Sequence, residues 1–425
     1  MSNQDDVTQQ ILAIATRSRQ AARKLAGASR NLKDGALHAM ANALLQHQGQ
    51  ILSANARDLE RGRTGGMSEG LLDRLELTSE RIEQISDSLL ELASLPDPVG
   101  EVLRGSTLPN GIRLQQVQVP MGVVGMIYEA RPNVTVDAAG LGLKSGNAVI
   151  LRGGSAAAET NTQIVQILSE AVASVGLPRD AIQSIDEFGR DGAVALMKAR
   201  GYVDLVVPRG GAGLIQTVVN EAKVPVIETG VGNCHVYVDR EVDQDQALAI
   251  VINSKTHRPS VCNAAEKLLV HQDRVHDFLP RVLSALSEAG VQLTGDERVR
   301  AVTPSGVVVE PAEEDDWACE FLALRAAVRV VDSLDEAIDH ISRYSSGHTD
   351  AICTTSLAAA DRFTAEVDSA VVNINASTRF TDGGQFGLGA EIGISTQKLH
   401  ARGPMGLAEL TTSKWIVHGQ GQIRE

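Results

Sequence analysis

Aromatic residues are scarce in this sequence, at 3% of 425 residues, so its cores would have to be built from Ala, Val, Leu and Ile rather than from rings. Cysteines are also few. The four of them show no CxxC spacing, which argues against a structural zinc site and favours free thiols in a reducing compartment. No apolar run approaches the length of a membrane span, and the acidic start at residues 1–6 is unlike a signal peptide. We therefore expect a cytoplasmic protein with no metal ion and no membrane partner.

Basic residues are outnumbered, because 39 Lys and Arg face 53 Asp and Glu and leave a net charge of −14. An acidic surface repels nucleic acid, so none is expected as a partner, and an anionic substrate would need a local cationic pocket. The chain is too long for one ordinary core, so we expect two or more domains.

The hydrophobic pattern changes along the chain. Apolar residues recur every three or four positions between residues 4 and 98, which predicts helices. Pro109-Asn110-Gly111 interrupts a loosely alternating segment, 106–119, and predicts a hairpin. Strand and helix patterns then alternate, as is typical of open parallel sheets with helices on both faces.

The segments that fit this alternation give a testable set of elements. Helices are predicted at 132–143, from the glycine turn at 153–155 to about residue 174, at 274–289 and at 334–344. Strands are predicted at 123–128, 147–152, 184–185, 203–207, 224–227, 235–238, 267–270, 328–331, 351–353, 371–374 and 415–417.

Cys262 ends the stretch Lys255-Thr-His-Arg-Pro-Ser-Val-Cys262. A thiol reacts as the thiolate, and nearby cations lower its pKa, so Lys255, His257 and Arg258 would favour a nucleophile. Pro259 and the serine after it suggest a loop from which the sulfur could reach a cleft. The alternative is that Cys262 is a small buried hydrophobic residue, as most free cysteines are.

Two glycine-rich turns follow predicted strands. In Val207-Pro-Arg-Gly-Gly-Ala-Gly213 the turn opens a helix, which is the geometry of a phosphate-binding turn, although the dinucleotide fingerprint is incomplete. In Leu151-Arg-Gly-Gly-Ser155 the arginine sits at the carboxyl end of a strand, where it could face a 2′-phosphate. Ordinary turns with solvated arginines remain an equal alternative. The candidate cofactor-binding residues are Arg152, Gly153, Gly154, Ser155, Arg209, Gly210, Gly211 and Gly213.

Three polar residues lie after other strand ends. Arg131 and Asn133 could bind an anion or donate to an oxyanion, although Asn133 could instead be the N-cap of the next helix and Arg131 a surface residue. Glu228 could bind a ribose or act as a general base, but a lone Glu after a strand is more often a solvated carboxylate.

A long polar, glycine-rich segment covers residues 373–391. Loops of this kind often carry binding function, and Ser377, Thr378 and Arg379 could hold a carboxylate or phosphate. An ordered connector is the alternative.

Taken together, the motifs resemble the γ-glutamyl phosphate reductase family, also called glutamate-5-semialdehyde dehydrogenase, of the aldehyde dehydrogenase superfamily. They are spread over most of the chain in the family's order, and the last two are long and specific. The matching stretches are YEARPNVT at 128–135, GNAVILRGG at 146–154, PRGGAGL at 208–214, KTHRPSVCN at 255–263, SGHTDAI at 346–352, NASTRFTDGGQFGLGAE at 375–391 and STQKLHARGPMGL at 395–407.

The resemblance implies an α/β aldehyde dehydrogenase-like fold with two open α/β domains and a small β oligomerisation arm. Its expected boundaries are a cofactor-binding domain at 1–103 and 120–230, a catalytic domain at 231–407, and the arm at 104–119 and 408–425. It also implies a homo-oligomer, and association with glutamate 5-kinase is a further expectation.

The resemblance further implies NADPH-dependent reduction of L-glutamyl 5-phosphate to L-glutamate 5-semialdehyde, a step of proline biosynthesis. Cys262 matches the family's catalytic cysteine and would form a thioester, with Asn133 assisting at the oxyanion. Arg131, Arg258, Ser377, Thr378 and Arg379 are the candidate substrate-binding residues. A hydrolytic aldehyde dehydrogenase using Glu228 as base, or a catalytically silent binding protein of the same fold, are the alternatives.

Overall fold

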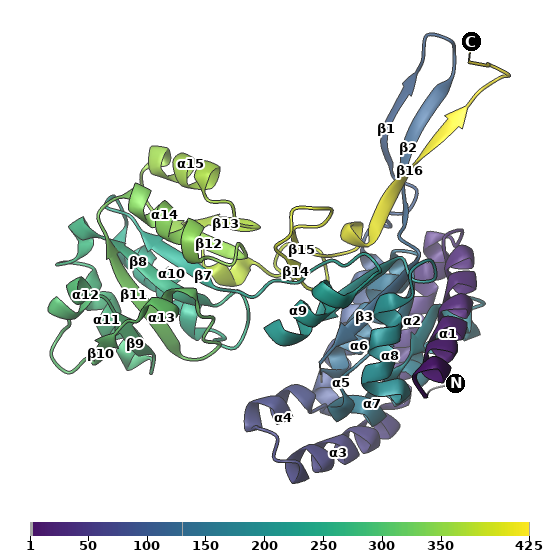
Figure 1. Ribbon diagram of the computed structural model, residues 1–425, viewed down its shortest axis with the longest axis horizontal. Helices are drawn as coiled ribbons and strands as arrows, with labels where there is room; N and C mark the ends of the chain where they lie inside the picture. Colours follow the sequence, from purple (N-terminus) through teal and green to yellow (C-terminus); the bar gives the residue numbers. More distant parts are fainter. Residues whose placement is uncertain (1–2, 130, 425) are drawn as a thin grey trace. The chain divides into compact units, whose positions relative to one another are not determined.

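The computed structural model describes residues 3–129 and 131–424, and the chain divides into two compact units (Figure 1). Unit 1 comprises Met1–Glu228, Gly387–Gly393 and Met405–Glu425, and unit 2 comprises Thr229–Phe386 and Ile394–Pro404. The short segments 387–393 and 405–407, which the expected boundaries assign to a catalytic domain, thus belong to unit 1. Within the described ranges, no helix has the length and apolar character to cross a membrane.

Unit 1 begins with five helices, which confirms the helical prediction for residues 4–98. Ser29 and Thr78 cap two of them, because each side chain accepts a hydrogen bond from a backbone N–H in the first turn. The five are α1 (Asn3–Leu25), α2 (Arg30–Gln46), α3 (Gln48–Thr64), α4 (Glu69–Leu75) and α5 (Ser79–Ser94).

A three-stranded antiparallel sheet follows, in the order β1-β2-β16 (Figure 1). The predicted hairpin is confirmed, with Gly111 in the turn at a φ of +85° that a side chain would disfavour. The last strand of the chain pairs with β2 from Thr411 to His418. The bounds are β1 (Val102–Thr107), β2 (Arg113–Pro120) and β16 (Thr411–His418).

The second sheet of unit 1 is parallel and has the order β5-β4-β3-β6. Its strand order reverses between β3 and β6, and a reversal of this kind is where open α/β sheets bind ligands. The elements are β3 (Val123–Tyr128), α6 (Pro132–Lys144), β4 (Ala148–Arg152), α7 (Ala158–Ser174), β5 (Ile182–Ser184), α8 (Gly189–Lys198), β6 (Leu205–Arg209) and α9 (Ala212–Glu221).

The strand predicted at 224–227 is wrong. Only an isolated bridge between Val206 and Val226 forms there. Pro225 has no N–H to donate and offers only its carbonyl, which accepts from the Val206 N–H at 2.8 Å, so a full ladder cannot develop.

Unit 2 is built on a seven-stranded parallel sheet with the order β10-β9-β11-β8-β7-β12-β13. The strands are β7 (Cys234–Val238), β8 (Ala265–His271), β9 (Gln292–Gly295), β10 (Val309–Pro311), β11 (Arg325–Val331), β12 (Thr349–Cys353) and β13 (Val371–Ile374), beside a short pair, β14 (Ile394–Ser395) and β15 (Gly403–Pro404). The helices are α10 (Gln244–Thr256), α11 (Leu279–Glu288), α12 (Glu297–Ala301), α13 (Glu314–Ala318), α14 (Leu334–Tyr344) and α15 (Leu357–Glu366). The predicted helix at 274–289 starts later, because residues 272–274 form a 3₁₀ turn.

Candidate active site

Cys262 lies on a tight turn between α10 and β8, which confirms the predicted loop. The Ala264 N–H donates to the Val261 carbonyl at 3.1 Å, so Cys262 and Asn263 are the two central residues of the turn. Cys262 is half-buried, unlike the fully buried Cys234 and Cys353. The turn precedes β8, so it lies at the amino-terminal edge of the parallel sheet. Functional residues of open α/β sheets are normally sought at the opposite edge, where the strands end.

The start of β7 lies directly against the backbone of this turn. The Cys234 thiol donates to the Cys262 carbonyl oxygen at 3.1 Å. Gly232 approaches the same carbonyl so closely that an added Cβ would lie 1.5 Å from its oxygen. The Gly232 N–H is bonded in turn to a Glu320 carboxylate oxygen at 2.7 Å. Gly232 therefore has to be glycine for the turn to hold this position.

Lys255 does not act as a cation near the sulfur in the way that its place in the sequence suggests. Its ammonium is buried and bonded to the Glu266 carboxylate at 2.9 Å. Burial lowers the pKa of Lys255 and raises that of Glu266, while the attraction between the two charges opposes both shifts. Lys255 closes the base of the loop as half of an ion pair.

Arginine side chains supply the positive groups of this region, and His257 accepts a hydrogen bond from one of them. The Arg379 guanidinium donates to His257 Nδ1 at 3.3 Å, and its pKa is lowered by burial. Arg379 also interacts electrostatically with Cys262 and with Arg258, whose side chain is exposed. The structure therefore brings together four residues that the sequence analysis singled out: Cys262, His257, Arg258 and Arg379.

Ser377 and Thr378 are more deeply placed than Arg379. The Ser377 hydroxyl shares a 3.0 Å hydrogen bond with Ser254 Oγ and accepts from the Arg379 N–H. The Thr378 N–H donates to Ser254 Oγ at 3.2 Å, and its own hydroxyl is buried with no partner among the described residues. These two residues fix the turn that presents Arg379, and their contact with substrate stays a prediction.

In unit 1, the glycine turn after β6 meets an anionic group. The Gly211 N–H donates to the Glu129 carboxylate at 3.1 Å, and an added Cβ at Gly210 would lie 2.8 Å from that carboxyl carbon. Gly213 faces open space in the first turn of α9. Arg209 donates to the Glu391 carbonyl at 3.4 Å. Because the Gly211 N–H is taken by Glu129, only the N–H groups in the first turn of α9, beside Arg209, fit the phosphates of a dinucleotide.

The turn after β4 is held by Asp186, which follows β5, and lies against Asn161 of α7. The Gly153 N–H donates to Asp186 at 2.6 Å, and an added Cβ would lie 2.0 Å from the Asn161 amide nitrogen. Arg152 donates to the Gly189 carbonyl at 3.3 Å and is only half-buried, and Ser155 is exposed. Arg152 and Ser155 are thus accessible to a ligand at the carboxyl edge, whereas Gly153 is a structural contact.

Asn133 is not an N-cap, so that alternative is wrong. The helix α6 is capped at Arg131, with Pro132 in its first turn, and Asn133 already lies inside it. The Asn133 amide donates to Asp137 at 3.3 Å. Asn133 belongs to unit 1 and Cys262 to unit 2, and their cooperation stays a prediction.

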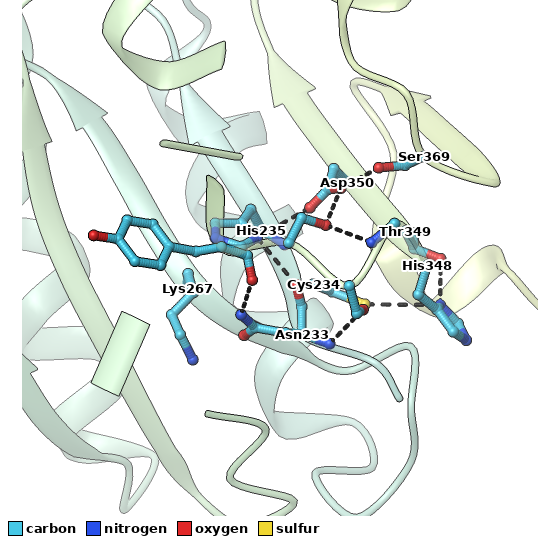
Figure 2. A network of polar contacts seen from close by, with 12 residues as sticks. Asn233, Cys234, His235, Lys267, His348, Thr349, Asp350 and Ser369 are labelled. Carbon is cyan, nitrogen blue, oxygen red and sulfur yellow. Dashed lines mark hydrogen bonds and ion pairs between the residues drawn. The ribbon is translucent and has the colours of Figure 1, made fainter. Parts of the chain in front are cut away.

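Sequence reasoning missed the residues beneath the cysteine turn, including Gly232, Cys234, Glu266 and His348. Figure 2 shows Cys234 and His348 within a network of buried polar residues on neighbouring strands. One sequence signal pointed to buried polar partners here: Glu266 and Lys267 stand together in the mostly apolar strand Ala265–His271, and charges in a buried strand require partners.

The arrangement is that of a two-unit α/β protein: unit 1 presents glycine-rich turns at the carboxyl edge of a parallel sheet, and unit 2 presents a half-buried cysteine on a turn. The sequence model of the aldehyde dehydrogenase family matches residues 3–315. The γ-glutamyl phosphate reductase of Kineococcus radiotolerans is 60% identical over 98% of this chain and 97% of its own. That of Thermobifida fusca is 59% identical over 99% of this chain and 100% of its own.

A solved structure agrees with these relatives. The crystal structure of γ-glutamyl phosphate reductase from Thermotoga maritima superposes with a TM-score of 0.95 at 46% identity, covering 98% of this chain and 100% of that one. This chain therefore belongs to the aldehyde dehydrogenase family and, within it, groups with the γ-glutamyl phosphate reductases. Membership confirms the predicted fold class and implies a nicotinamide cofactor.

Proposed function

We propose that this protein reduces L-glutamyl 5-phosphate to L-glutamate 5-semialdehyde with release of phosphate, in proline biosynthesis, through a thioester on Cys262. The observation that carries the proposal is the half-exposed Cys262 on a turn beside the guanidinium groups of Arg379 and Arg258. Positive groups around a thiol favour the thiolate and attract the phosphate of an acyl phosphate. The names of the closely similar relatives support the same substrate.

The first step is acyl transfer to sulfur. The Cys262 thiolate attacks the acyl carbon, the C–S bond forms, and the bond from carbon to the phosphate oxygen breaks, so that phosphate leaves with that electron pair. Arg258 and Arg379 would bind the departing anion, and we assign them to that role ahead of Arg131, Ser377 and Thr378 in the substrate set. Asn133 and backbone N–H groups near the turn would stabilise the oxyanion.

We propose NADPH as the cofactor, held at the carboxyl edge of the unit 1 sheet. Arg152 would bind its 2′-phosphate beside Gly154 and Ser155. Arg209 and the first turn of α9 at Gly213 would bind the pyrophosphate, because the Gly211 N–H is held by Glu129. When bound, NADPH supplies the hydride that reduces the thioester. The resulting thiohemiacetal expels the Cys262 thiolate and releases the aldehyde.

No residue is needed to activate water in this sequence of steps, so we assign no base to Glu228. A hydrolytic enzyme would instead need such a base and would oxidise the aldehyde without phosphate. The test is NADP⁺ reduction by glutamate semialdehyde with and without inorganic phosphate. We expect steady turnover only with phosphate. Equal turnover without phosphate, lost in Glu228→Gln, would overturn the proposal in favour of hydrolysis.

We also propose that the β1-β2-β16 sheet mediates self-association and that the protein works in the cytoplasm. The sheet exposes Val102, Leu103, Trp415 and Val417, which are between 48% and 60% exposed. None of the four cysteines forms a disulfide with another described residue, and thiols of this kind are typical of a reducing compartment. Replacing Trp415 and Val417 by Ser should lower the molar mass measured by light scattering. An unchanged mass would exclude this sheet as the surface of self-association. Association with glutamate 5-kinase can be tested by sedimentation of a mixture.

A further inference from the structure

The Glu129 side chain lies where a phosphate group of a dinucleotide is expected to bind. Glu129 follows β3 and the glycine turn 210–211 follows β6, and these two strands pair with Tyr128 opposite Arg209. The Glu129 N–H donates to the Arg209 carbonyl at 3.1 Å, so the pairing continues one residue beyond β3. The Glu129 carboxylate then accepts the Gly211 N–H at 3.1 Å. The contact therefore stands at the carboxyl edge of the unit 1 sheet, where the strand order reverses.

The turn has room for this carboxylate because it lacks side chains. An added Cβ at Gly210 would lie 2.8 Å from the Glu129 carboxyl carbon, and one at Gly211 would lie 3.6 Å from its Oε1. Two glycines in succession leave the backbone open to an anion at close range. Gly211 is also the N-cap of α9, which has no side-chain cap among the described residues and no acidic residue in its first turn. Glu129 thus supplies, from the neighbouring strand, the negative group that a helix start attracts.

A carboxylate and a phosphate are both anionic acceptors, and one N–H cannot serve both of them at full strength. A pyrophosphate bound by Arg209 and the first turn of α9 would lie beside the Glu129 carboxylate, and the two negative groups would repel each other. The Glu129 side chain is exposed, so it can turn into solvent without leaving a cavity behind. Cofactor binding therefore gives up one of two contacts of the Gly211 N–H, either that to Glu129 or that to a phosphate oxygen.

We propose that Glu129 competes with the pyrophosphate of the cofactor for the Gly211 N–H, and thereby weakens cofactor binding and speeds cofactor release. The inference rests on the proposed function, from which it takes the dinucleotide site at this turn. Arg152 and Arg209 attract the cofactor there, whereas Glu129 opposes it. A reductase exchanges NADP⁺ for NADPH in every turnover, and a resident anion at the phosphate turn shortens the time for which the spent cofactor stays bound.

The experiment compares Glu129→Ala and Glu129→Gln with Glu221→Gln. Glu129→Ala frees the Gly211 N–H and removes the charge, whereas in Glu129→Gln the uncharged amide oxygen can still accept the hydrogen bond. Glu221 is exposed at the other end of α9, so Glu221→Gln is the matched control for the loss of one negative charge. Fluorescence titration gives the Kd of NADPH, and stopped-flow displacement by excess NADP⁺ gives its dissociation rate. Adenosine 2′-phosphate, which lacks the pyrophosphate, is titrated as a competitor.

We expect Glu129→Ala to lower both the Kd and the dissociation rate of NADPH by about ten-fold, the order of one hydrogen bond to a charged group. Glu129→Gln should lower them by about three-fold, because it removes the repulsion alone. The Kd of adenosine 2′-phosphate, and the Kd of NADPH in Glu221→Gln, should change by less than about two-fold.

Two results would overturn the competition. One is an NADPH Kd that rises or stays the same in Glu129→Ala, and the other is a Kd that falls equally for adenosine 2′-phosphate. Unsubstituted protein that binds no NADPH would instead defeat the proposed cofactor, and with it the proposed function.

Discussion

The Lys255 ammonium and the Glu266 carboxylate form a buried ion pair, 2.9 Å apart, across the base of the loop that carries Cys262. Lys255 lies in the last turn of α10 and Glu266 is the second residue of β8, so this contact fixes the two ends of the loop to each other. Glu266 also accepts the Leu322 N–H at 3.2 Å, which ties the pair to the next segment of unit 2. The cationic character near the sulfur therefore depends on Arg258 and Arg379.

Removing one member of this pair should be costly. Lys255→Met leaves the Glu266 carboxylate buried without its counter-ion, and we expect the free energy of unfolding to fall by about 3–5 kcal/mol. Urea unfolding measures it. The double variant Lys255→Met with Glu266→Gln should recover much of the loss, because it buries no net charge. A double variant that is as unstable as the sum of both single variants would contradict a coupled pair.

Asp186 should make stability depend on pH in an unusual direction. Burial raises its pKa from 3.8 to about 6 in the folded protein, against hydrogen bonds from Gly153 and Asn161 that lower it. The folded state therefore binds more protons between pH 4 and 6, and this contribution to stability is lost as pH rises through that window. The loss is about 3 kcal/mol for two pKa units, at 1.36 kcal/mol each.

The measurement is the urea midpoint of the protein and of Asp186→Asn at several pH values from 4 to 7. The difference in stability between the two should shift in favour of the variant as pH rises across the window. A difference that stays constant with pH would show that Asp186 does not titrate there.

Arg152 should contribute to the choice of cofactor. If it binds the 2′-phosphate, Arg152→Gln should raise KM for NADPH by about ten-fold or more and change KM for NADH little, since NADH lacks that phosphate. Arg179, exposed and paired with Glu170 on the same unit, provides the control Arg179→Gln. Equal increases for both cofactors would argue for a structural effect through the Gly189 carbonyl.

Arg379 should act on phosphate. Arg379→Gln removes a charge near Cys262, and we expect KM for inorganic phosphate in the oxidative direction to rise by about ten-fold or more, with a smaller effect on KM for NADP⁺. His257→Gln tests the residue that accepts from Arg379 and should have a weaker effect of the same kind. Arg298→Gln, which disrupts an exposed pair with Asp332, is the control. An unchanged phosphate KM in Arg379→Gln would remove this residue from the site.

The fold was largely predictable because its strands are apolar and its helices periodic. The strand at 123–128 and the helix at 334–344 match the structure residue for residue. The strands β9 and β10 escaped prediction, because each is short and contains a single aliphatic residue, whereas the equally short β13 is mostly aliphatic. The strand predicted at 224–227 failed because the missing N–H of Pro225 outweighs the apolar run around it.

The site was predictable only where residues are neighbours in sequence or belong to a recognisable motif. Cys262 stands out for both reasons, and Arg379 for the second. Glu266 and Cys234 could not be assigned to the site from the sequence, because their roles depend on burial and on strand pairing that brings β7 beside β8. For the same reason the sequence suggested a charged Lys255 near the sulfur, whereas its true partner is the carboxylate of Glu266.

The most direct test of the thioester is to trap it. With glutamate semialdehyde and NADP⁺ but no phosphate, acid quenching and peptide mass analysis should find a glutamyl adduct on the peptide containing Cys262, formed in a single turnover. Added phosphate should discharge the adduct, and Cys262→Ala should form none. An unmodified Cys262 during turnover, or the same adduct in Cys262→Ala, would contradict the thioester and with it the account of this site.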